Sequence, residues 1–330
     1  MKQTVFIIKK ELFPGSEAIA DAFAAALQQT AQGICQNVEI FEEDQLQACL
    51  AAAAQDSILV LDVSMPLLTP IDIKHMFGAV QPGKPVLATE ALPQGFHVEN
   101  AMQASQALFS LRKQKNDALL ASGVLLIDPL HTYIDPDVQV APGVVIHPGC
   151  TLEKGAVIEA GCVLLPGCRI QASTVGEGCT VESSVLLSCT VGKKTTIGPF
   201  AYLRPGSCIG DHCRIGDFVE VKNSSIADGA KVSHLTYVGD SDVGKRVNIG
   251  CGVVFVNYDG KYKHRSKVAD DAFIGCNTNL VSPIEVGEHA FVAAGTTLTA
   301  NVPAGALALS RTPQVVKEGW VTKRKQKGKL

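Results

Sequence analysis

Residues 134–170 read "IDPDVQVAPGVVIHPGCTLEKGAVIEAGCVLLPGCRI", and every sixth residue of this stretch is aliphatic. The aliphatic series is Ile134, Val140, Ile146, Leu152, Ile158, Leu164 and Ile170. Small or medium apolar residues follow four positions after the first six of these, at Val138, Val144, Cys150, Ala156, Cys162 and Cys168. Neither an α-helix, with a period of about 3.6, nor a strand, with a period of about 2, produces this spacing. The pattern is a hexapeptide repeat, which is typical of a parallel β-helix.

In such a β-helix each hexapeptide supplies one short strand and one corner, and three hexapeptides close a triangular coil. The aliphatic side chain points inward from the strand, and the small residue fills the narrow space near the corner. Because a single coil cannot bury its own inward face, stability comes from stacking many coils at about 4.8 Å. Periodicity does not determine handedness, although crossovers between parallel strands are usually right-handed.

The same period continues toward the C-terminus with shifts of register. It slips around residues 171–190, runs from 191 to 221, slips by one residue, and continues to Ile249 with a further slip. A last run extends from Val268 to Leu298. The segment "VNYDGKYKHRSK", residues 256–267, interrupts the repeat. The sequence therefore predicts a β-helix over residues 128–310 with one inserted segment.

Composition excludes several classes of protein. The chain has 330 residues and a net charge of -3, which does not indicate a nucleic-acid-binding protein. It has no apolar leader and no apolar run near the roughly 18 residues of a membrane span, so we expect a cytoplasmic protein. Eleven cysteines without C-x-x-C spacing favour reduced thiols and no metal site. The basic tail, residues 311–330, is either a solvated chain end or a phosphate-binding extension.

Residues 1–98 differ from the repeat. Strand-like stretches, "TVFIIKK", "NVEIF", "SILVLDVS" and "KPVLAT", alternate with helix-like ones, which predicts a small α/β domain with a mostly parallel sheet. Residues 99–127 read as a linker helix leading into the β-helix. Neither G-x-G-x-x-G nor G-x-x-x-x-G-K-[ST] follows the first strand, so the usual glycine-rich phosphate loop is missing.

Five polar residues lie off the inward register of the repeat, where the core does not need them: Arg204, Lys222, His234, Tyr237 and Asn248. A single outward histidine is usually a solvated surface residue. Five residues of complementary chemistry on neighbouring coils favour a functional site instead. The inserted segment 256–267 is either a tolerated loop or a functional loop carried by a rigid scaffold.

These residues belong to stretches that resemble a known family. "IGPFAYLRPG", "GDFVEVKN", "SHLTYVGD", "VNIGCG", "VNYDGKYK" and "LALSRTPQVVKEGW" closely resemble the acetyltransferase half of the bacterial bifunctional N-acetylglucosamine-1-phosphate uridyltransferase / glucosamine-1-phosphate acetyltransferase family. The resemblance covers roughly residues 107–321. It implies a left-handed β-helix, a homotrimer with sites at subunit boundaries, and acetyl transfer from acetyl-CoA to the amine of glucosamine-1-phosphate without a metal.

The resemblance also implies roles for individual residues. His234 matches the catalytic base. The residues that match the sugar-phosphate site are Arg204, Lys222, Tyr237, Asn248 and Lys263. The residues that match the acetyl-CoA site are Cys251, Asn257, Tyr258, Cys276, Ala294 and Arg311. At Cys251, Cys276 and Ala294 the family contacts acetyl-CoA largely through the backbone, so the side chain there is less constrained.

The N-terminal part departs from the family. "SILVLDVSMPLL", residues 57–68, resembles its strand and turn "VLVLYGD-x-PLL", but Val63 and Ser64 stand where the family has Gly-Asp. That aspartate is the family's magnesium ligand, and a serine cannot replace a carboxylate on a hard cation. The resemblance therefore implies a shortened, degenerate nucleotidyltransferase-like domain without uridyltransferase activity.

Three other functions stay open at this point. The first is an acyltransferase acting on another amino sugar or sugar nucleotide. The second is a metal-dependent hydratase on the same scaffold, which needs three converging histidines that the spacing of His212, His234, His264 and His289 does not supply. The third is a non-catalytic regulatory homologue, suggested by the degenerate N-terminal domain.

Overall fold

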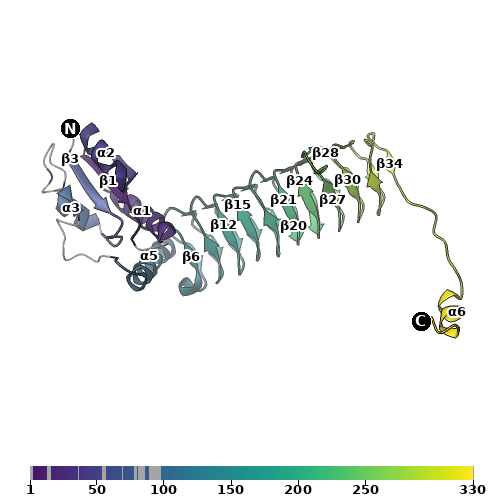
Figure 1. The fold of residues 1–330 in the computed structure, drawn as a ribbon, viewed down its shortest axis with the longest axis horizontal. Coiled ribbons are helices and arrows are strands. Elements are labelled where there is room, and N and C mark those ends of the chain that lie inside the picture. The colour runs from purple at the N-terminus through teal and green to yellow at the C-terminus, as the bar shows by residue number, and fades with distance from the viewer. Residues whose placement is uncertain are drawn as a thin grey trace.

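The computed structural model describes residues 3–12, 16–35, 37–53, 57–68, 70–77, 80, 86–88 and 98–329. A small α/β unit lies at one end of an elongated molecule, and a solenoid of stacked coils extends from it (Figure 1). The chain ends in a short helix, α6 (Trp320–Gln326), which lies apart from the coils. No helix within these ranges is long and apolar enough to cross a lipid bilayer.

The N-terminal unit contains the predicted parallel sheet. Its strand order is β2-β1-β3-β4, and every pair is parallel. The strands are β1 (Gln3–Lys9), β2 (Asn37–Glu42), β3 (Ser57–Asp62) and β4 (Val86–Leu87). The helices are α1 (Glu17–Gln32), the 3-10 turn η1 (Glu43–Gln45), α2 (Leu46–Ala52) and α3 (Pro70–Phe77). Residues of α1 and α3 pack on one face of the sheet and residues of α2 on the other, which confirms the predicted α/β unit.

Helix α5 (Ala101–Ala121) joins the two parts, within the range predicted for the linker. Asn100 caps its first turn by accepting the backbone N–H of Gln103 at 3.1 Å. Ala104 and Ala107 belong to the core of the α/β unit, whereas Leu119 belongs to the core of the solenoid. The helix therefore covers the open end of the first coil, and the first solenoid strand, β5 (Leu125–Leu126), begins four residues after it.

The solenoid consists of strands β5 to β34, each two to four residues long, in three parallel sheets of 9, 11 and 10 strands. The first coil contains β5, β6 (Tyr133–Ile134) and β7 (Gln139–Val140), and the last strands are β31 (Glu285–Val286), β32 (Phe291–Val292), β33 (Thr297–Leu298) and β34 (Leu307–Ala308). Every predicted inward residue from Ile146 to Ile170 is at most 1% exposed, as are the corner cysteines in that range. The coils form the predicted left-handed parallel β-helix.

Shortened corners explain the slips in the repeat. Ile158 pairs with Val175, and Ile170 pairs with Leu186, so these coils contain fewer residues than three full hexapeptides. At such a corner Ala172 adopts a positive φ of 46°. A residue in the left-handed region turns the chain more tightly, so the coil closes with fewer residues while the inward side chains stay stacked.

Candidate active site

A histidine–carboxylate pair lies where two neighbouring coils leave one sheet. Strands β20 (Arg214–Asp217) and β23 (Lys231–His234) pair so that Asp217 stands opposite His234. Nδ1 of His234 is 2.5 Å from Oδ1 of Asp217, and this hydrogen bond lowers the pKa of the Asp217 carboxyl. Because an ionised carboxylate only accepts hydrogen bonds, Nδ1 carries a proton, and in the neutral imidazole Nε2 is then the nitrogen with the free lone pair. His234 is half-exposed, so Nε2 is available to accept a proton from a bound amine.

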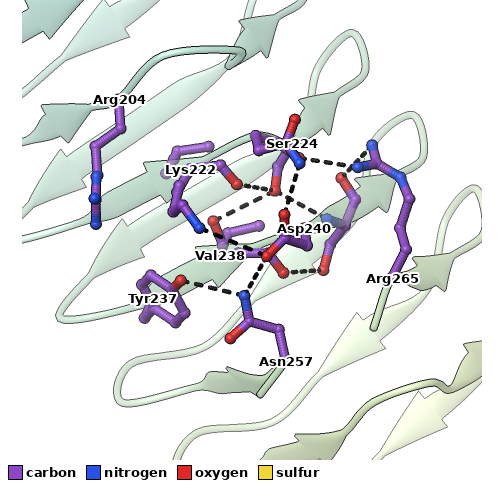
Figure 2. Close-up of polar contacts among 12 residues, drawn as sticks. Arg204, Lys222, Ser224, Tyr237, Val238, Asp240, Asn257 and Arg265 are labelled. Carbon is purple, nitrogen blue, oxygen red and sulfur yellow. Dashed lines mark hydrogen bonds and ion pairs between the residues drawn. The ribbon is translucent and has the colours of Figure 1, made fainter. Parts of the chain in front are cut away.

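The adjoining sheet contains β18 (Tyr202–Leu203), β21 (Glu220–Lys222) and β24 (Tyr237–Gly239), and cationic side chains lie at the ends of the first two. Arg204 follows β18 directly, and its Nη1 lies 2.7 Å from Oε1 of Glu220. Lys222 ends β21, and its Nζ is 3.8 Å from Oδ2 of Asp240. Figure 2 shows both side chains on neighbouring coils, with Tyr237 on the next. Arg204, Lys222 and Tyr237 are each partly exposed.

The inserted segment lies beside these cations. It leaves the coil between β27 (Val254–Val256) and β28 (Ser266–Val268). Nδ2 of Asn257 donates to Oδ2 of Asp240 at 2.5 Å and lies 3.3 Å from the Tyr237 hydroxyl. Tyr258 and Lys263 form an antiparallel bridge. The neighbouring Lys222 ammonium lowers the pKa of Lys263, so two like charges stand side by side, which favours a bound anion.

Internal contacts give the inserted segment a defined shape. The Asp259 carboxylate accepts backbone N–H groups of Lys261 at 2.8 Å and Tyr262 at 2.7 Å, and it lies 2.7 Å from Nε2 of His264. The hydrogen bond from His264, followed by the two backbone bonds, lowers the pKa of Asp259 to about 2. Arg265 forks onto both oxygens of Asp242, at 2.7 and 2.6 Å, and fixes the end of the segment to the coil.

Three of the six residues expected to contact acetyl-CoA follow one edge of the solenoid. His234 precedes the corner at Leu235, whose carbonyl accepts the N–H of Gly252 at 3.1 Å. The Cys251 carbonyl accepts the N–H of Asn277, and the Cys276 carbonyl accepts the N–H of Gly295, each at 2.8 Å. Cys251, Cys276 and Ala294 therefore stack in successive coils along the edge that begins at His234. Cys276 and Ala294 are exposed, so a long ligand can lie along this edge.

Two predicted site residues stay apart from the others within one chain. Asn248 begins β26 (Asn248–Ile249), where it pairs with Lys231 and not with His234, so it lies toward the opposite end of the strand. Arg311 is exposed in the extended segment after β34. Across residues 98–329, no hydrogen bond or ion pair joins either side chain to His234 or Lys222.

Sequence reasoning missed two carboxylates of the site, Asp217 and Asp240. Both could have been found from one signal, because Asp217 precedes His234 by 17 residues and Asp240 precedes Asn257 by 17. Seventeen residues is one coil in this part of the solenoid. A search for polar pairs separated by one coil would have singled them out.

One group of possible metal ligands lies elsewhere, at a different corner of the coils. Asp271, Glu288 and His289 place one ligand atom each within 4.8 Å of the others. Arg246 already binds both oxygens of Asp271, at 2.7 and 2.6 Å. Two of the three residues are exposed, and the group shares no residue with the His234 site.

Comparison with known proteins agrees with the hexapeptide repeat. The family described as "Bacterial transferase hexapeptide (six repeats)" matches residues 188–223. A "Bifunctional protein GlmU" from Clostridium perfringens is 56% identical over 217 residues, which is 66% of this chain and 48% of the relative. Its namesake from Clostridium acetobutylicum is 51% identical over 227 residues, 69% of this chain and 50% of the relative. The namesake from Clostridioides difficile is 48% identical over 230 residues, covering 70% and 50%.

The chain spans about half the length of these curated relatives. A solved UDP-N-acetylglucosamine acyltransferase from Francisella novicida is 16% identical, with a TM-score of 0.41 over 62% of this chain and 74% of that chain. The C-terminal part of this chain is homologous to part of the bifunctional protein GlmU, and it carries a hexapeptide repeat.

Proposed function

We propose that the chain is an acyltransferase that moves the acetyl group of acetyl-CoA onto the amine of glucosamine-1-phosphate, giving N-acetylglucosamine-1-phosphate for UDP-GlcNAc and cell-wall precursor synthesis. One observation carries the proposal: His234, oriented by Asp217, stands at the corner where an exposed edge for a long ligand meets a sheet that bears adjacent cations. The similarity to proteins named GlmU supports the same reading.

The chemistry needs a base, an oriented acceptor and a leaving thiol. Nε2 of His234 takes a proton from the amine as its nitrogen bonds to the thioester carbon. The C–S bond then breaks, and the CoA sulfur takes up the proton. Asp217 holds the imidazole in the required tautomer and stabilises the imidazolium formed in this step. A base of this kind typically contributes about 10² to 10⁴ in rate.

The cationic side chains of the site suit an acceptor that carries a phosphate group. Lys222 and Lys263 present adjacent ammonium groups, and Arg204 adds a guanidinium on the preceding coil. Charge-assisted hydrogen bonds from these groups to phosphate oxygens would orient the sugar with its amine toward a histidine. No metal is needed for this reaction, because the acceptor is held by cationic side chains.

A second and third copy of the chain would complete the site. Asn248 and Arg311 lie apart from the cations of their own chain, and Phe200, Phe218 and Leu235 form an exposed apolar ridge at the corner next to His234. Phe200 and Phe218 stack with ring centroids 5.3 Å apart. Burial of this ridge between subunits of a homotrimer would bring the His234 edge of one copy against the cations of another.

The N-terminal unit supports no uridyltransferase activity in this proposal. At the turn after β3 the nearest carboxylate, Asp62, is bound to Lys10 at 2.6 Å and accepts the backbone N–H of Ser64 at 2.8 Å. Ser64 itself offers no carboxylate to a divalent cation. A separate nucleotidyltransferase must therefore use the acetylated product.

An acceptor panel tests the proposal. Purified chain is incubated with acetyl-CoA and, separately, glucosamine-1-phosphate, glucosamine-6-phosphate, glucosamine and UDP-glucosamine, and products are detected by mass spectrometry. We expect kcat/KM for glucosamine-1-phosphate to exceed that for glucosamine by at least about a hundredfold, because the charged contacts are lost with the phosphate. Preference for UDP-glucosamine would instead establish the alternative acyltransferase, and failure to acetylate any acceptor would favour a regulatory homologue.

A further inference from the structure

The buried carboxylate of Asp240 joins three coils at the cationic side of the site. Asp240 as a whole residue is only 8% exposed to solvent. Oδ1 accepts Nδ2 of Asn223 at 2.6 Å, Oδ2 accepts Nδ2 of Asn257 at 2.5 Å, and Nζ of Lys222 lies 3.8 Å from Oδ2. Figure 2 shows Asp240 between Lys222 and Asn257, at the centre of these contacts.

Asp240 stays ionised in spite of its burial. Burial by itself raises the pKa of the carboxyl, but the hydrogen bonds from Asn223 and Asn257 and the charges of Lys222 and Lys263 outweigh it, so the pKa of Asp240 is lowered. Burying a charge is costly unless it is paired and hydrogen-bonded. The two amides and the lysine supply that compensation, so each of them is held in place by the same carboxylate.

The negative charge of Asp240 offsets the repulsion between the ammonium groups of Lys222 and Lys263. Their ammonium groups repel each other, and the charge of Lys222 lowers the pKa of Lys263, whereas the charge of Asp240 acts in the opposite direction. Lys263 belongs to the inserted segment, and Asn257 at the start of that segment is anchored to Asp240. The position and the protonation of Lys263 therefore both depend on Asp240.

We infer that Asp240 is the positioning residue for the phosphate-binding pair Lys222 and Lys263, holding Lys222 directly and Lys263 through Asn257. This inference rests on the proposed binding of a sugar phosphate at these lysines. In this role Asp240 sets the affinity for the acceptor, and it leaves the proton transfer at His234 unchanged.

The variant Asp240→Asn tests the inference with little strain. Asp240 has a φ of 47°, in a region that asparagine also adopts readily. The amide keeps the shape of the side chain, but it removes the charge and one acceptor oxygen. We expect KM for glucosamine-1-phosphate to rise by at least about tenfold, as for the loss of a charged hydrogen-bonded contact. We expect kcat to stay within about threefold and KM for acetyl-CoA to be unchanged.

The pH dependence of acceptor affinity shows whether Asp240 acts through its charge on Lys263 or only by keeping the local structure rigid. The titratable and charged groups that face Lys263 are Lys222, Asp240 and Tyr237. Since the charge of Asp240 raises the pKa of Lys263, its removal lets that pKa fall further. The alkaline loss of acceptor affinity should therefore move to lower pH in Asp240→Asn. A variant that only loosens the structure would keep the wild-type midpoint.

Two further variants complete the test. Asp242→Asn weakens the ion pair between Asp242 and Arg265, which is the other anchor of the inserted segment. This change leaves the contacts of both lysines intact, so KM for glucosamine-1-phosphate should stay within about threefold of wild type. Asn223→Gly removes one bond to Asp240 at a φ of 46° that glycine accepts, and it should raise KM in the same direction by a smaller factor. Asn223→Gly tests the same inference if Asp240→Asn does not fold.

Direct binding distinguishes this inference from the proposed reaction. Calorimetry with glucosamine-1-phosphate should show tighter binding to wild type than to Asp240→Asn even if acetyl transfer is not observed, in which case the proposed reaction fails and the positioning role stands. An equal rise of KM in Asp242→Asn would overturn the inference. So would loss of kcat without loss of affinity in Asp240→Asn, or a wild type that binds no glucosamine-1-phosphate.

Discussion

At the scale of single residues, the site depends on pairs of polar side chains that one coil of the solenoid brings together. Asp217 meets His234 and Asp240 meets Asn257 because strands of successive coils lie in register. In each pair one partner is ionised, which makes the hydrogen bond short and directional. The β-helix thus gives a rigid frame in which a residue's neighbour is set by coil length.

The Asp217 carboxylate should control turnover rather than binding. In Asp217→Asn the negative charge that stabilises the His234 imidazolium is lost, although the shape is kept. We expect kcat to fall about 10- to 100-fold, as for loss of a hydrogen bond to a charged group, with KM for acetyl-CoA unchanged. Steady-state kinetics with saturating acetyl-CoA measures this.

The matched control is Asp128→Asn. Asp128 also binds Nδ1 of a histidine, His131, at 2.7 Å, but at the first coil of the solenoid. This variant should keep kcat within about twofold, because surface ion pairs contribute little. Equal losses in both variants would contradict the assigned role of Asp217.

At the scale of elements, the repeat could be predicted closely from sequence and the contacts outside it could not. The spacing of Ile134 to Ile170 indicates which side chains point inward, because that choice depends on local periodicity alone. It does not give the places where corners shorten. The site pairs depend on those corners, so Asp217 and Asp240 could be assigned only after each coil length was known. The fold of the inserted segment depends on Asp259, His264 and Arg265, whose contacts no repeat encodes.

A charge on the inward face should unfold the coils. Val232 on β23 is fully buried between coils, and Val232→Asp would place a carboxylate there without a partner. We expect a loss of unfolding free energy above about 4 kcal/mol, seen as a lower thermal midpoint by circular dichroism. Lys231→Asp changes the adjacent exposed residue and should shift stability by no more than about 0.5 kcal/mol. Similar midpoints for the two variants would contradict the assigned register.

The inserted segment should open in acid. The pKa of Asp259 is lowered from 3.8 to about 2 in the folded segment, so its contribution is complete above 3.8 and is lost as pH falls toward 2. Amide exchange, corrected for intrinsic rates, should show constant protection of residues 258–264 down to about pH 4 and a fall below it. Asp259→Asn should lack this protection at neutral pH. Protection that persists in that variant would show that other contacts shape the segment.

At the scale of the whole molecule, the apolar ridge supports the proposed assembly. Phe200, Phe218 and Leu235 are each 57 or 58% exposed, and all three adopt a positive φ at successive corners. A bulky residue in the left-handed region is strained, so a compensating contact is expected. Phe218→Asn, which suits that backbone, should weaken the proposed trimer in sedimentation equilibrium. His212→Asn, at another exposed corner with a φ of 54°, should leave the assembly unchanged. A wild-type monomer at micromolar concentration would contradict the proposed assembly.

The α/β unit was also predicted as a fold, and α5 connects it to the first coil. Sequence could not show how that connection is made. Asn116 is buried, and its Nδ2 donates to the carbonyls of Pro129 and Thr132, at 2.8 and 3.1 Å. These bonds satisfy the carbonyls at the start of the solenoid, a need that is visible only once the coil is closed.

The most direct test of the account compares N-acetylglucosamine-1-phosphate formation by wild type, His234→Asn and His212→Asn, using acetyl-CoA, glucosamine-1-phosphate and mass spectrometry. UTP with N-acetylglucosamine-1-phosphate is supplied in a parallel reaction. The account predicts product with wild type and His212→Asn, at least about a hundredfold less with His234→Asn, and no UDP-N-acetylglucosamine from any of them. Turnover by His234→Asn near the wild-type rate would contradict the assigned base, and UDP-N-acetylglucosamine formation would contradict the proposed loss of activity in the N-terminal unit.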